Sequence, residues 1–454
     1  MTKLKDKIQG DVLKIGDLKY EETRKIFNAA ITKQPSIIVV CKAAEDVSEA
    51  VKYATKNGLE IAVRGGGHHV SGTSLTDGGL LIDLSQMTTV EVHKDSQTVT
   101  VQGGATLADI DEETQKYGLA VPTGTVSETG IAGLALSGGV GYLRGVLGLS
   151  CDQLVEANIV TASGDQKVVN KDTNDDLFWA ICGGGGNFGV VTEFKFNLHP
   201  VGPEVLAFDV MYDLNDGMQV FRGLNEYLTQ APEEVSVNMT VMDLPAAPML
   251  PEFLHNKPVM VIAGMYAGDA DEGQDIIDPL RKLAEPIIDQ TGVIPYINLQ
   301  KKLDPMVPKG ASFKGTSLFF KDLSEDTFKQ LLDEKDKAPG GLLMQLWEMH
   351  GQVNFVPADY NAFSVRDSQY LLLLDLVYEP GLDEVANDWA DKFYETFAPF
   401  SLNGAAYLNG IDPKKDVIER TYGSNYQRLK EIKAKYDPHN VFARNHNIKA
   451  NQEV

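Results

Sequence analysis

Residues 61–72 read Ile-Ala-Val-Arg-Gly-Gly-Gly-His-His-Val-Ser-Gly, an apolar strand that runs into three glycines and then two histidines. Consecutive glycines leave no side chains where a backbone passes a ligand, and they permit positive φ, so successive N–H groups can converge on an anion. The stretch favours a phosphate or pyrophosphate cradle with an imidazole at its rim. A glycine-rich turn with two surface histidines has the same pattern. A metal site is disfavoured because neighbouring side chains on a strand point to opposite faces.

Length, net charge and cysteine spacing limit the classes of protein to which this sequence can belong. At 454 residues the chain exceeds one usual core, so two or three structural lobes are expected. A net charge of −23 argues against nucleic acid and anionic membranes as partners. Cys41, Cys151 and Cys182 have no disulfide or metal-ligand spacing. Residues 1–11 lack the apolar segment of a signal peptide, so a cytoplasmic protein is expected.

The first 200 residues predict short strands and helices without long regular alternation, which favours an α+β fold. Thr106 followed by Asp109 is typical of a capping box and predicts a helix that ends near Gly118. Strands are expected at 37–40, 80–84, 90–92, 99–101, 155–161, 167–169 and 190–198, and further helices at 44–57 and 175–182.

A second glycine-rich segment spans residues 122–154, PTGTVSETGIAGLALSGGVGYLRGVLGLSCDQL. Each glycine in a helix interior costs about 1 kcal/mol relative to alanine, so this segment predicts no regular helix. Apolar residues between the glycines favour burial over a merely flexible loop. Contact with a flat aromatic ligand explains both features.

A literal GxGxxG occurs at Gly184, Gly186 and Gly189, which raises a nicotinamide-binding Rossmann fold as an alternative. That fingerprint requires a strand before it and a helix after it. Here a helical pattern precedes the glycines and an alternating strand follows them. The Rossmann interpretation is therefore rejected, and these glycines are assigned to the same ligand as the other two segments.

From about residue 205 the pattern changes to long strands and amphipathic helices. Their order predicts an antiparallel sheet with helices on one face. The other face is left uncovered and can form one wall of a binding site. Strands are expected at 205–212, 235–241, 258–266, 312–320, 342–349 and 370–378, and helices at 216–230, 272–291, 325–337 and 383–396.

Three segments resemble a known family, in the family's order: VRGGGHHVSGTSLTDGGLLIDLSQM at 63–87, NFGVVTEF at 187–194 and TYGSNYQRLKEIKAKYDPHNVFARNHNI at 421–448. They are similar to the berberine-bridge-type oxidases of the vanillyl-alcohol-oxidase-like, PCMH-type FAD superfamily. The glycine segment GLALSGGVGYL resembles the bacterial-type members. The resemblance implies a two-part FAD-binding domain at 1–203 with its core at about 33–201, a substrate-binding domain at 204–402, and a C-terminal segment at 403–454 that returns to the FAD domain.

In this family the histidine directly after the glycines bonds covalently to the 8α-methyl group of the flavin, which corresponds to His68. Some members carry a second, cysteinyl bond, but Val126 occupies that position, so a single histidyl link is implied. Cys151 is nearby in sequence, where a small buried cysteine is the commoner interpretation. Thr129 aligns with the residue that governs oxygen reactivity, and its size favours an oxidase.

The resemblance further implies a set of residues that contact FAD. They are Arg64, Gly65, Gly66, Gly67, His69, Ser71, Gly72, Thr123, Gly124, Thr129, Gly130, Gly133, Leu134, Gly139, Gly141, Tyr142, Gly189, Val190, Val191, Asn445 and Asn447. Three further side chains are candidates for catalysis: Trp347 could stack on substrate, and Tyr407 and Tyr422 could serve as hydrogen-bond partners or base.

The implied activity is removal of a hydride from a CH–OH or CH–NH carbon of a small organic substrate, with oxygen reduced to hydrogen peroxide. The expected partners are this substrate and oxygen, with no metal, nucleic acid or membrane, in a monomer or homodimer. A flavin dehydrogenase with another acceptor and a non-catalytic covalent flavoprotein remain as alternatives. No hydrolase triad, P-loop or HExxH motif is present.

Overall fold

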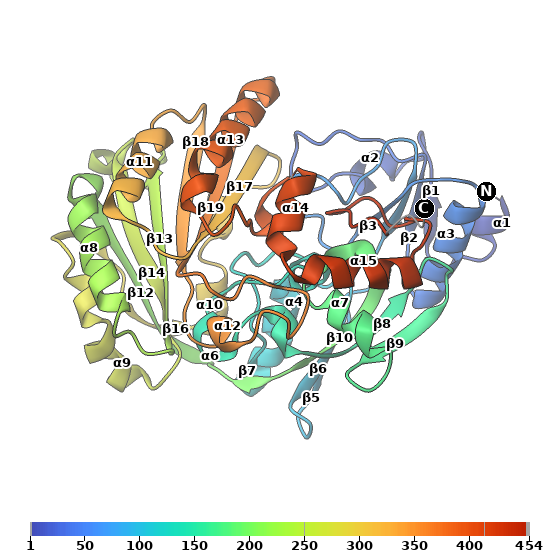
Figure 1. Cartoon of the computed structure of the whole chain (residues 1–454), viewed down its shortest axis with the longest axis horizontal. Helices are drawn as coiled ribbons and strands as arrows, with labels where there is room; N and C mark the ends of the chain where they lie inside the picture. Colours follow the sequence, from blue (N-terminus) through green and yellow to red (C-terminus); the bar gives the residue numbers. More distant parts are fainter. Residues whose placement is uncertain (1, 249, 413, 451–454) are drawn as a thin grey trace.

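The computed structural model describes residues 2–248, 250–412 and 414–450. Within these ranges the strands form sheets of four, five, two and eight strands. The four- and five-stranded sheets belong to the first 200 residues and lie on one side of the molecule, whereas the eight-stranded sheet lies on the other (Figure 1). The predicted α+β class is confirmed.

The four-stranded sheet has the order β1-β2-β4-β3, in which β2, β4 and β3 are parallel. Its elements are β1 (Asp11–Leu13), β2 (Ile37–Val40), α3 (Ala44–Lys56), β3 (Ile61–Arg64) and β4 (Leu80–Asp83). α3 packs through Val47, Ala50, Val51 and Ala54, which recur at helical spacing and are fully buried. The glycine loop begins where β3 ends.

The five-stranded sheet is antiparallel throughout. Its order is β5 (Val90–His93), β6 (Thr98–Gln102), β10 (Val190–Asn197), β8 (Leu154–Val160) and β9 (Gln166–Asn170). Beside it, α4 (Leu107–Thr114) begins with the predicted capping box, since Thr106 and Asp109 cap each other's backbone N–H groups. The turn that follows α4 ends at Gly118 in the left-handed conformation, where a side chain is disfavoured. α7 (Asp175–Ile181) also lies where the sequence predicts it.

The eight-stranded sheet is antiparallel, in the order β15-β12-β14-β13-β18-β19-β17, with β16 also paired to β12. Four helices cover one face (Figure 1) and bury Phe221, Phe328 and Phe393 against it. The other face turns toward the loops of the first 200 residues, as predicted. The elements are β12 (Glu204–Asp213), α8 (Gly217–Leu228), β13 (Val235–Asp243), β14 (Pro258–Tyr266), α9 (Ala270–Ile277), β15 (Pro286–Asp289), β16 (Gly292–Pro295), β17 (Ser312–Phe320), α11 (Glu325–Lys335), β18 (Gly341–Glu348), β19 (Tyr370–Tyr378) and α13 (Asp383–Phe397).

Two expectations about helices were wrong. The helix expected at 272–291 ends at Ile277, because Pro279 and Pro286 cannot continue the backbone hydrogen bonding, and residues 286–295 instead form β15 and β16. The second glycine-rich segment does contain a short helix, α5 (Ile131–Leu136). Burial of the apolar side chains of α5 outweighs the helix cost of Gly133.

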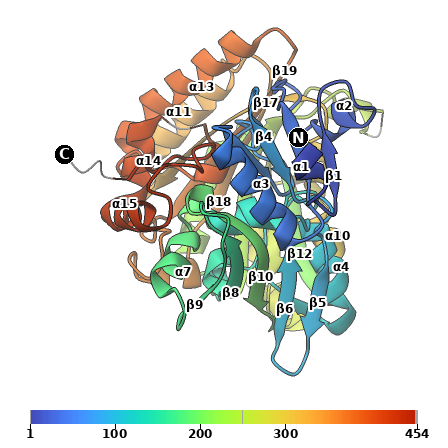
Figure 2. The ribbon, with the colours of Figure 1, turned by 90° about the vertical axis from the view of Figure 1, so that its right-hand side faces the viewer.

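The C-terminal part returns to the first half of the chain. α14 (Lys415–Tyr422) leads into α15 (Asn425–Tyr436), which packs along α7 (Figure 2). Fully buried Lys433 binds Asp437 at 2.6 Å and donates to the carbonyls of Asn187 and Phe442, which fixes the start of the tail. Among the described residues no helix is both long and apolar enough to cross a bilayer.

Candidate active site

A cavity of about 320 Å³ lies where the loops of the first 200 residues meet the uncovered face of the eight-stranded sheet. Its wall combines the glycine loop, the second glycine-rich segment, residues 185–191, strands β17 to β19 and the C-terminal tail. Segments from both ends of the chain thus enclose one space. The predicted residues that line it are Gly65, Gly66, Gly67, His68, His69, Gly124, Thr129, Gly130, Gly133, Leu134, Gly189, Val190, Val191, Asn445, Trp347 and Tyr407.

The glycines of the wall serve two purposes. A Cβ built at Gly66 would lie 2.4 Å from the nitrogen of Gly130, and one built at Gly130 would lie 2.2 Å from the nitrogen of Gly66, so this pair lets two loop backbones touch. Gly133 and Gly186 also line the cavity, but no heavy atom lies within 4 Å of a Cβ built at either position. Close passage of a ligand explains these two glycines, and the cradle fits a flat cofactor such as FAD.

His68 lies at the rim of the glycine loop, and its ring stacks on Phe27 with the ring centres 3.9 Å apart. Burial lowers the pKa of His68 to about 4, so the imidazole is neutral near pH 7. Its Nε2 is buried and has no hydrogen-bond partner among the described residues. A neutral imidazole with an unpaired nitrogen in the wall of this cavity is suited to bond with a cofactor.

His69 has a different role, because its ring is fully hydrogen-bonded. Nε2–H donates to the carbonyl of Leu408 at 2.8 Å, so Nδ1 accepts, both from the backbone N–H of Ser71 at 3.2 Å and from its hydroxyl at 2.8 Å. His69 therefore ties the glycine loop to the C-terminal segment that carries Tyr407 and Asn409.

Arg64, expected to contact FAD, does not line the cavity. Its guanidinium forms a two-point ion pair with fully buried Asp83, at 2.5 and 3.1 Å. It also donates to the backbone carbonyls of Thr23 and Lys25. Arg64 thus anchors the chain segment that precedes Phe27.

Seven other residues assigned to FAD also lie outside the cavity wall: Ser71, Gly72, Thr123, Gly139, Gly141, Tyr142 and Asn447. Close packing explains the glycines, since a Cβ at Gly141 would lie 1.7 Å from the carbonyl oxygen of Thr123. Likewise a Cβ at Gly139 or Gly72 would meet Ser150 or Ile31 within 2.5 Å. Thr123 accepts a hydrogen bond from Gln300, and Tyr142 packs behind Trp347.

The sheet face of the cavity is largely apolar. Phe313 from β17, Trp347 from β18, and Leu371 and Leu373 from β19 point into it, together with Tyr407. The hydroxyl of Tyr407 accepts hydrogen bonds from the backbone N–H of Val140 at 3.2 Å and the Asn409 amide at 3.1 Å. Trp347 Nε1 donates to Gln345, which holds the indole in place.

Tyr422, the third catalytic candidate, does not line the cavity. Its hydroxyl donates to the carbonyl of Gly183 at 3.4 Å, behind the glycines of residues 183–186. Burial raises the pKa of both Tyr422 and Tyr407. Both phenols are therefore protonated near neutral pH, so neither is suited to act as a base.

Sequence reasoning missed Asp375, which lies in the cavity wall on β19. Burial raises the pKa of this carboxyl to about 6, and no hydrogen bond or cation of the described residues offsets the shift. A signal was present, because Asp375 is the single charged residue of the strand YLLLLDLVY. Glu348 of β18 does not line the cavity and instead contacts Arg144 and His350. Asn409, Arg444 and His446 of the wall were also missed.

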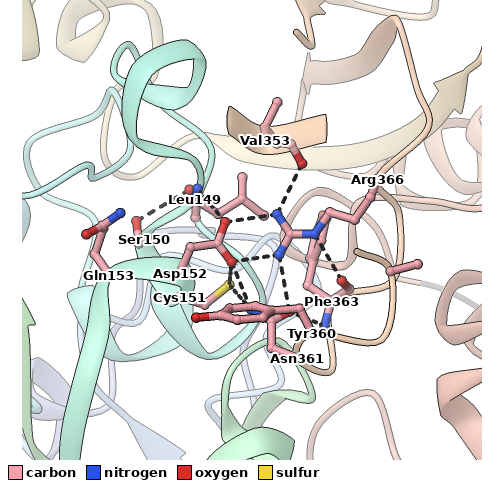
Figure 3. Close-up of polar contacts among 12 residues, drawn as sticks. Leu149, Ser150, Cys151, Asp152, Gln153, Val353, Tyr360, Asn361, Phe363 and Arg366 are labelled. Carbon is pink, nitrogen blue, oxygen red and sulfur yellow. Dashed lines mark hydrogen bonds and ion pairs between the residues drawn. The ribbon is translucent and has the colours of Figure 1, made fainter. Parts of the chain in front are cut away.

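A buried ion pair joins the end of the second glycine-rich segment to the loop that precedes β19, and thereby joins the two halves of the molecule (Figure 3). Arg366 binds both carboxylate oxygens of Asp152, at 2.7 and 2.9 Å, and Asn361 donates to the same carboxylate at 2.8 Å. The ring of Phe363, from the same loop as Arg366, packs against Gly138, where a Cβ would lie 2.9 Å from two of its carbons. Cys151 is buried in this network and does not line the cavity, in agreement with the commoner interpretation.

The fold and the cavity together define a protein built to enclose a large cofactor between a glycine-rich half and an antiparallel sheet. Comparisons with known proteins give the family. A family model described as FAD binding domain matches residues 35–170, and one described as berberine and berberine like matches residues 406–449. An FAD-linked oxidoreductase of Dictyostelium discoideum is 32% identical over 451 residues, which cover 98% of this chain and 95% of that protein. The chain belongs to the berberine-bridge-like FAD-linked oxidoreductases.

Other relatives have named activities. (R)-6-hydroxynicotine oxidase of Paenarthrobacter nicotinovorans is 40% identical over 200 residues, 44% of each chain. The crystal structure of 6-hydroxy-D-nicotine oxidase from Arthrobacter nicotinovorans has a TM-score of 0.86 at 27% identity, covering 97% of this chain and 98% of that one. A chitooligosaccharide oxidase shares the fold, with a TM-score of 0.86 at 24% identity. The chain is thus an FAD-dependent oxidoreductase, and its relatives include an oxidase.

Proposed function

We propose that this protein is an oxidase that carries FAD on a single covalent bond to His68 and oxidises a CH–OH or CH–NH carbon of a small organic substrate. The observation that carries the proposal is the neutral, buried imidazole of His68, whose Nε2 is unpaired at the rim of a cavity with the family's FAD-binding sequence. When bound, FAD supplies the acceptor for two electrons, and the protein supplies binding, orientation and proton transfer.

Asp375 is proposed as the base that takes the O–H or N–H proton of the substrate. It lines the cavity, and its pKa of about 6 makes it a carboxylate at neutral pH that still has useful basicity. Apolar Leu373 on the same strand and Phe313 on β17 also line the cavity, and Trp347 offers a flat surface on which a ring can stack. A compact substrate fits this lining.

Tyr407 is proposed to donate a hydrogen bond to the reacting oxygen or nitrogen. Its oxygen already accepts from Val140 and Asn409, so the hydroxyl proton is free to point into the cavity. We expect Tyr407→Phe to lower kcat/KM by about tenfold, the loss of one hydrogen bond of about 1.4 kcal/mol. Steady-state kinetics at saturating oxygen measure this effect, and an unchanged kcat/KM would remove Tyr407 from the reaction.

Oxygen is proposed as the final acceptor because Thr129, a small side chain, lines the cavity beside Gly130 and Gly133. The relatives named as oxidases support this choice. Hydrogen peroxide should then form in a one-to-one ratio with oxidised substrate. Substrate oxidation that proceeds only with an artificial electron acceptor would favour a dehydrogenase, and bound flavin that no substrate reduces would favour a non-catalytic flavoprotein.

The covalent link is tested with His68→Ala. After acid precipitation we expect the wild-type pellet to stay yellow and fluorescent, whereas the variant releases all of its flavin into the supernatant. His199→Gln is the control, because this histidine lies outside the cavity wall, on Gln153, and its substitution should leave the bond intact. Covalent flavin that persists in His68→Ala would contradict the assignment.

A further inference from the structure

Phe27 is an unexpected part of the cavity wall, because it comes from a segment before the first parallel strand. Its ring stacks on the imidazole of His68, with the centres 3.9 Å apart and the planes 19° apart. The same ring stacks on Phe313 of β17, at 4.5 Å and 27°. The imidazole is thus the end of a three-ring stack that starts on the eight-stranded sheet.

The segment that carries Phe27, residues 23–28, is held from both sides. Arg64 donates to the carbonyls of Thr23 and Lys25, and the N–H of Phe27 donates to the carbonyl of Gly67 at 3.2 Å. These bonds fix the segment to the glycine loop. Because Gly67 directly precedes His68, the position of Phe27 and that of the imidazole are set by the same backbone.

On the other side, Asn28 fixes the segment to the sheet. Its amide donates to the carbonyls of Val70 at 2.6 Å and Phe313 at 2.9 Å, and its Oδ1 accepts from the N–H of Phe313 at 3.0 Å. Asn28 is 1% exposed, so solvent does not compete for these bonds. The stack therefore has a fixed backbone at both of its ends.

We propose that Phe27 is a positioning residue for covalent attachment of FAD: its ring holds the imidazole plane of His68 so that a ring nitrogen faces the 8α-methyl carbon. This inference rests on the proposed attachment at His68. In the attachment step a nitrogen–carbon bond forms, a methyl C–H bond breaks, and the methyl hydrogen and the imidazole N–H hydrogen leave as protons. The two electrons reduce the flavin, and oxygen reoxidises it to give hydrogen peroxide.

The test compares Phe27→Leu with wild type after purification of each with its flavin. Leucine keeps apolar bulk but offers no flat face to the imidazole. We expect total flavin per chain to stay near the wild-type value, while covalent attachment slows about fivefold, because loss of a stacked aromatic pair lowers the population of the correctly oriented imidazole by about that factor. The covalent share, compared at the same early time after FAD becomes available, should fall accordingly. Absorbance gives total flavin, and fluorescence of the denatured chain in a gel gives the covalent share.

Two variants control for structure. Phe328→Leu breaks a stacked pair of the same kind, Phe221 with Phe328 at 4.1 Å, in the core on the far face of the sheet, and should keep full covalent attachment. Phe27→Tyr keeps a flat ring and should restore most of the covalent share.

Equal covalent shares in Phe27→Leu and wild type would overturn the positioning role. So would a loss of total flavin in Phe27→Leu together with an unchanged covalent share of what remains. Should Phe27→Leu fail to fold, Phe27→Tyr decides. This variant keeps the flat ring, so a folded, flavin-loaded Phe27→Tyr without covalent flavin would contradict the positioning role. Covalent flavin in His68→Ala would instead defeat the proposed function itself, so the two failures are distinguishable.

Discussion

Asp375→Asn is expected to lower kcat/KM by about 10²- to 10⁴-fold, the usual contribution of a positioned general base. Asparagine keeps the size of the side chain and its place on β19 but cannot accept a proton. FAD content and the absorption spectrum should stay as in wild type, because Asp375 lies on the sheet side of the cavity and not in the glycine cradle. Stopped-flow measurement of flavin reduction isolates the step that should slow.

The pH profile of the wild-type enzyme gives an independent check of the same residue. Only the carboxylate form of Asp375 can take a proton, and the pKa of this group is about 6. Flavin reduction should therefore be slow below pH 6, rise as pH passes through about 6, and level off above it. The Asp375→Asn variant should lack this rise, and a rise that persists unchanged would assign the titration to another group.

Arg366→Met is expected to lower the free energy of unfolding by about 3–5 kcal/mol, because it leaves the carboxylate of Asp152 buried without its cation. Both side chains are at most 5% exposed. The remaining donors to Asp152 are the N–H of Leu149, the thiol of Cys151 and the amide of Asn361, which are neutral and offset only part of the loss. Urea denaturation of the flavin-loaded protein measures the change.

A double-mutant cycle separates the ion pair from general packing. Asp152→Asn combined with Arg366→Met removes both charges, so the double variant should be more stable than Arg366→Met alone. The solvent-exposed pair Arg222–Glu325 is the control, and Arg222→Met should leave stability within the error of measurement. A double variant no more stable than Arg366→Met would show that packing, and not charge, explains the loss.

Local patterns predicted most of the elements, because each depended on neighbours in sequence. The helical spacing of Val47, Ala50 and Val51 and the capping box at Thr106 needed no knowledge of distant residues, and both are present. The helix expected at 272–291 was wrong because Pro279 and Pro286 interrupt helical hydrogen bonding, which outweighs the amphipathic pattern of the segment. The short helix α5 was missed because tertiary burial outweighs a propensity cost of about 1 kcal/mol.

The site was harder to predict, because its geometry depends on contacts that are far apart in sequence. His68 could be proposed from its motif, but the motif does not reveal that Arg64 turns away to Asp83. The role of each glycine was also ambiguous in the sequence. Gly141 allows two backbones to pack closely, whereas Gly133 borders open space. Asp375 could have been proposed from its strand alone, but its place in the cavity follows only from the strand order β18-β19-β17.

The contribution of the C-terminal tail to the cavity wall affects when the cavity can form during synthesis of the chain. Asn445 and His446 complete a wall whose first residue, Phe27, is made early in translation. A growing chain therefore cannot close this cavity around a ligand until residues 445 and 446 have left the ribosome. Because a ligand that binds only the folded state stabilises it, FAD bound in this cavity should raise the free energy of unfolding and join the two ends of the chain in one cooperative unit.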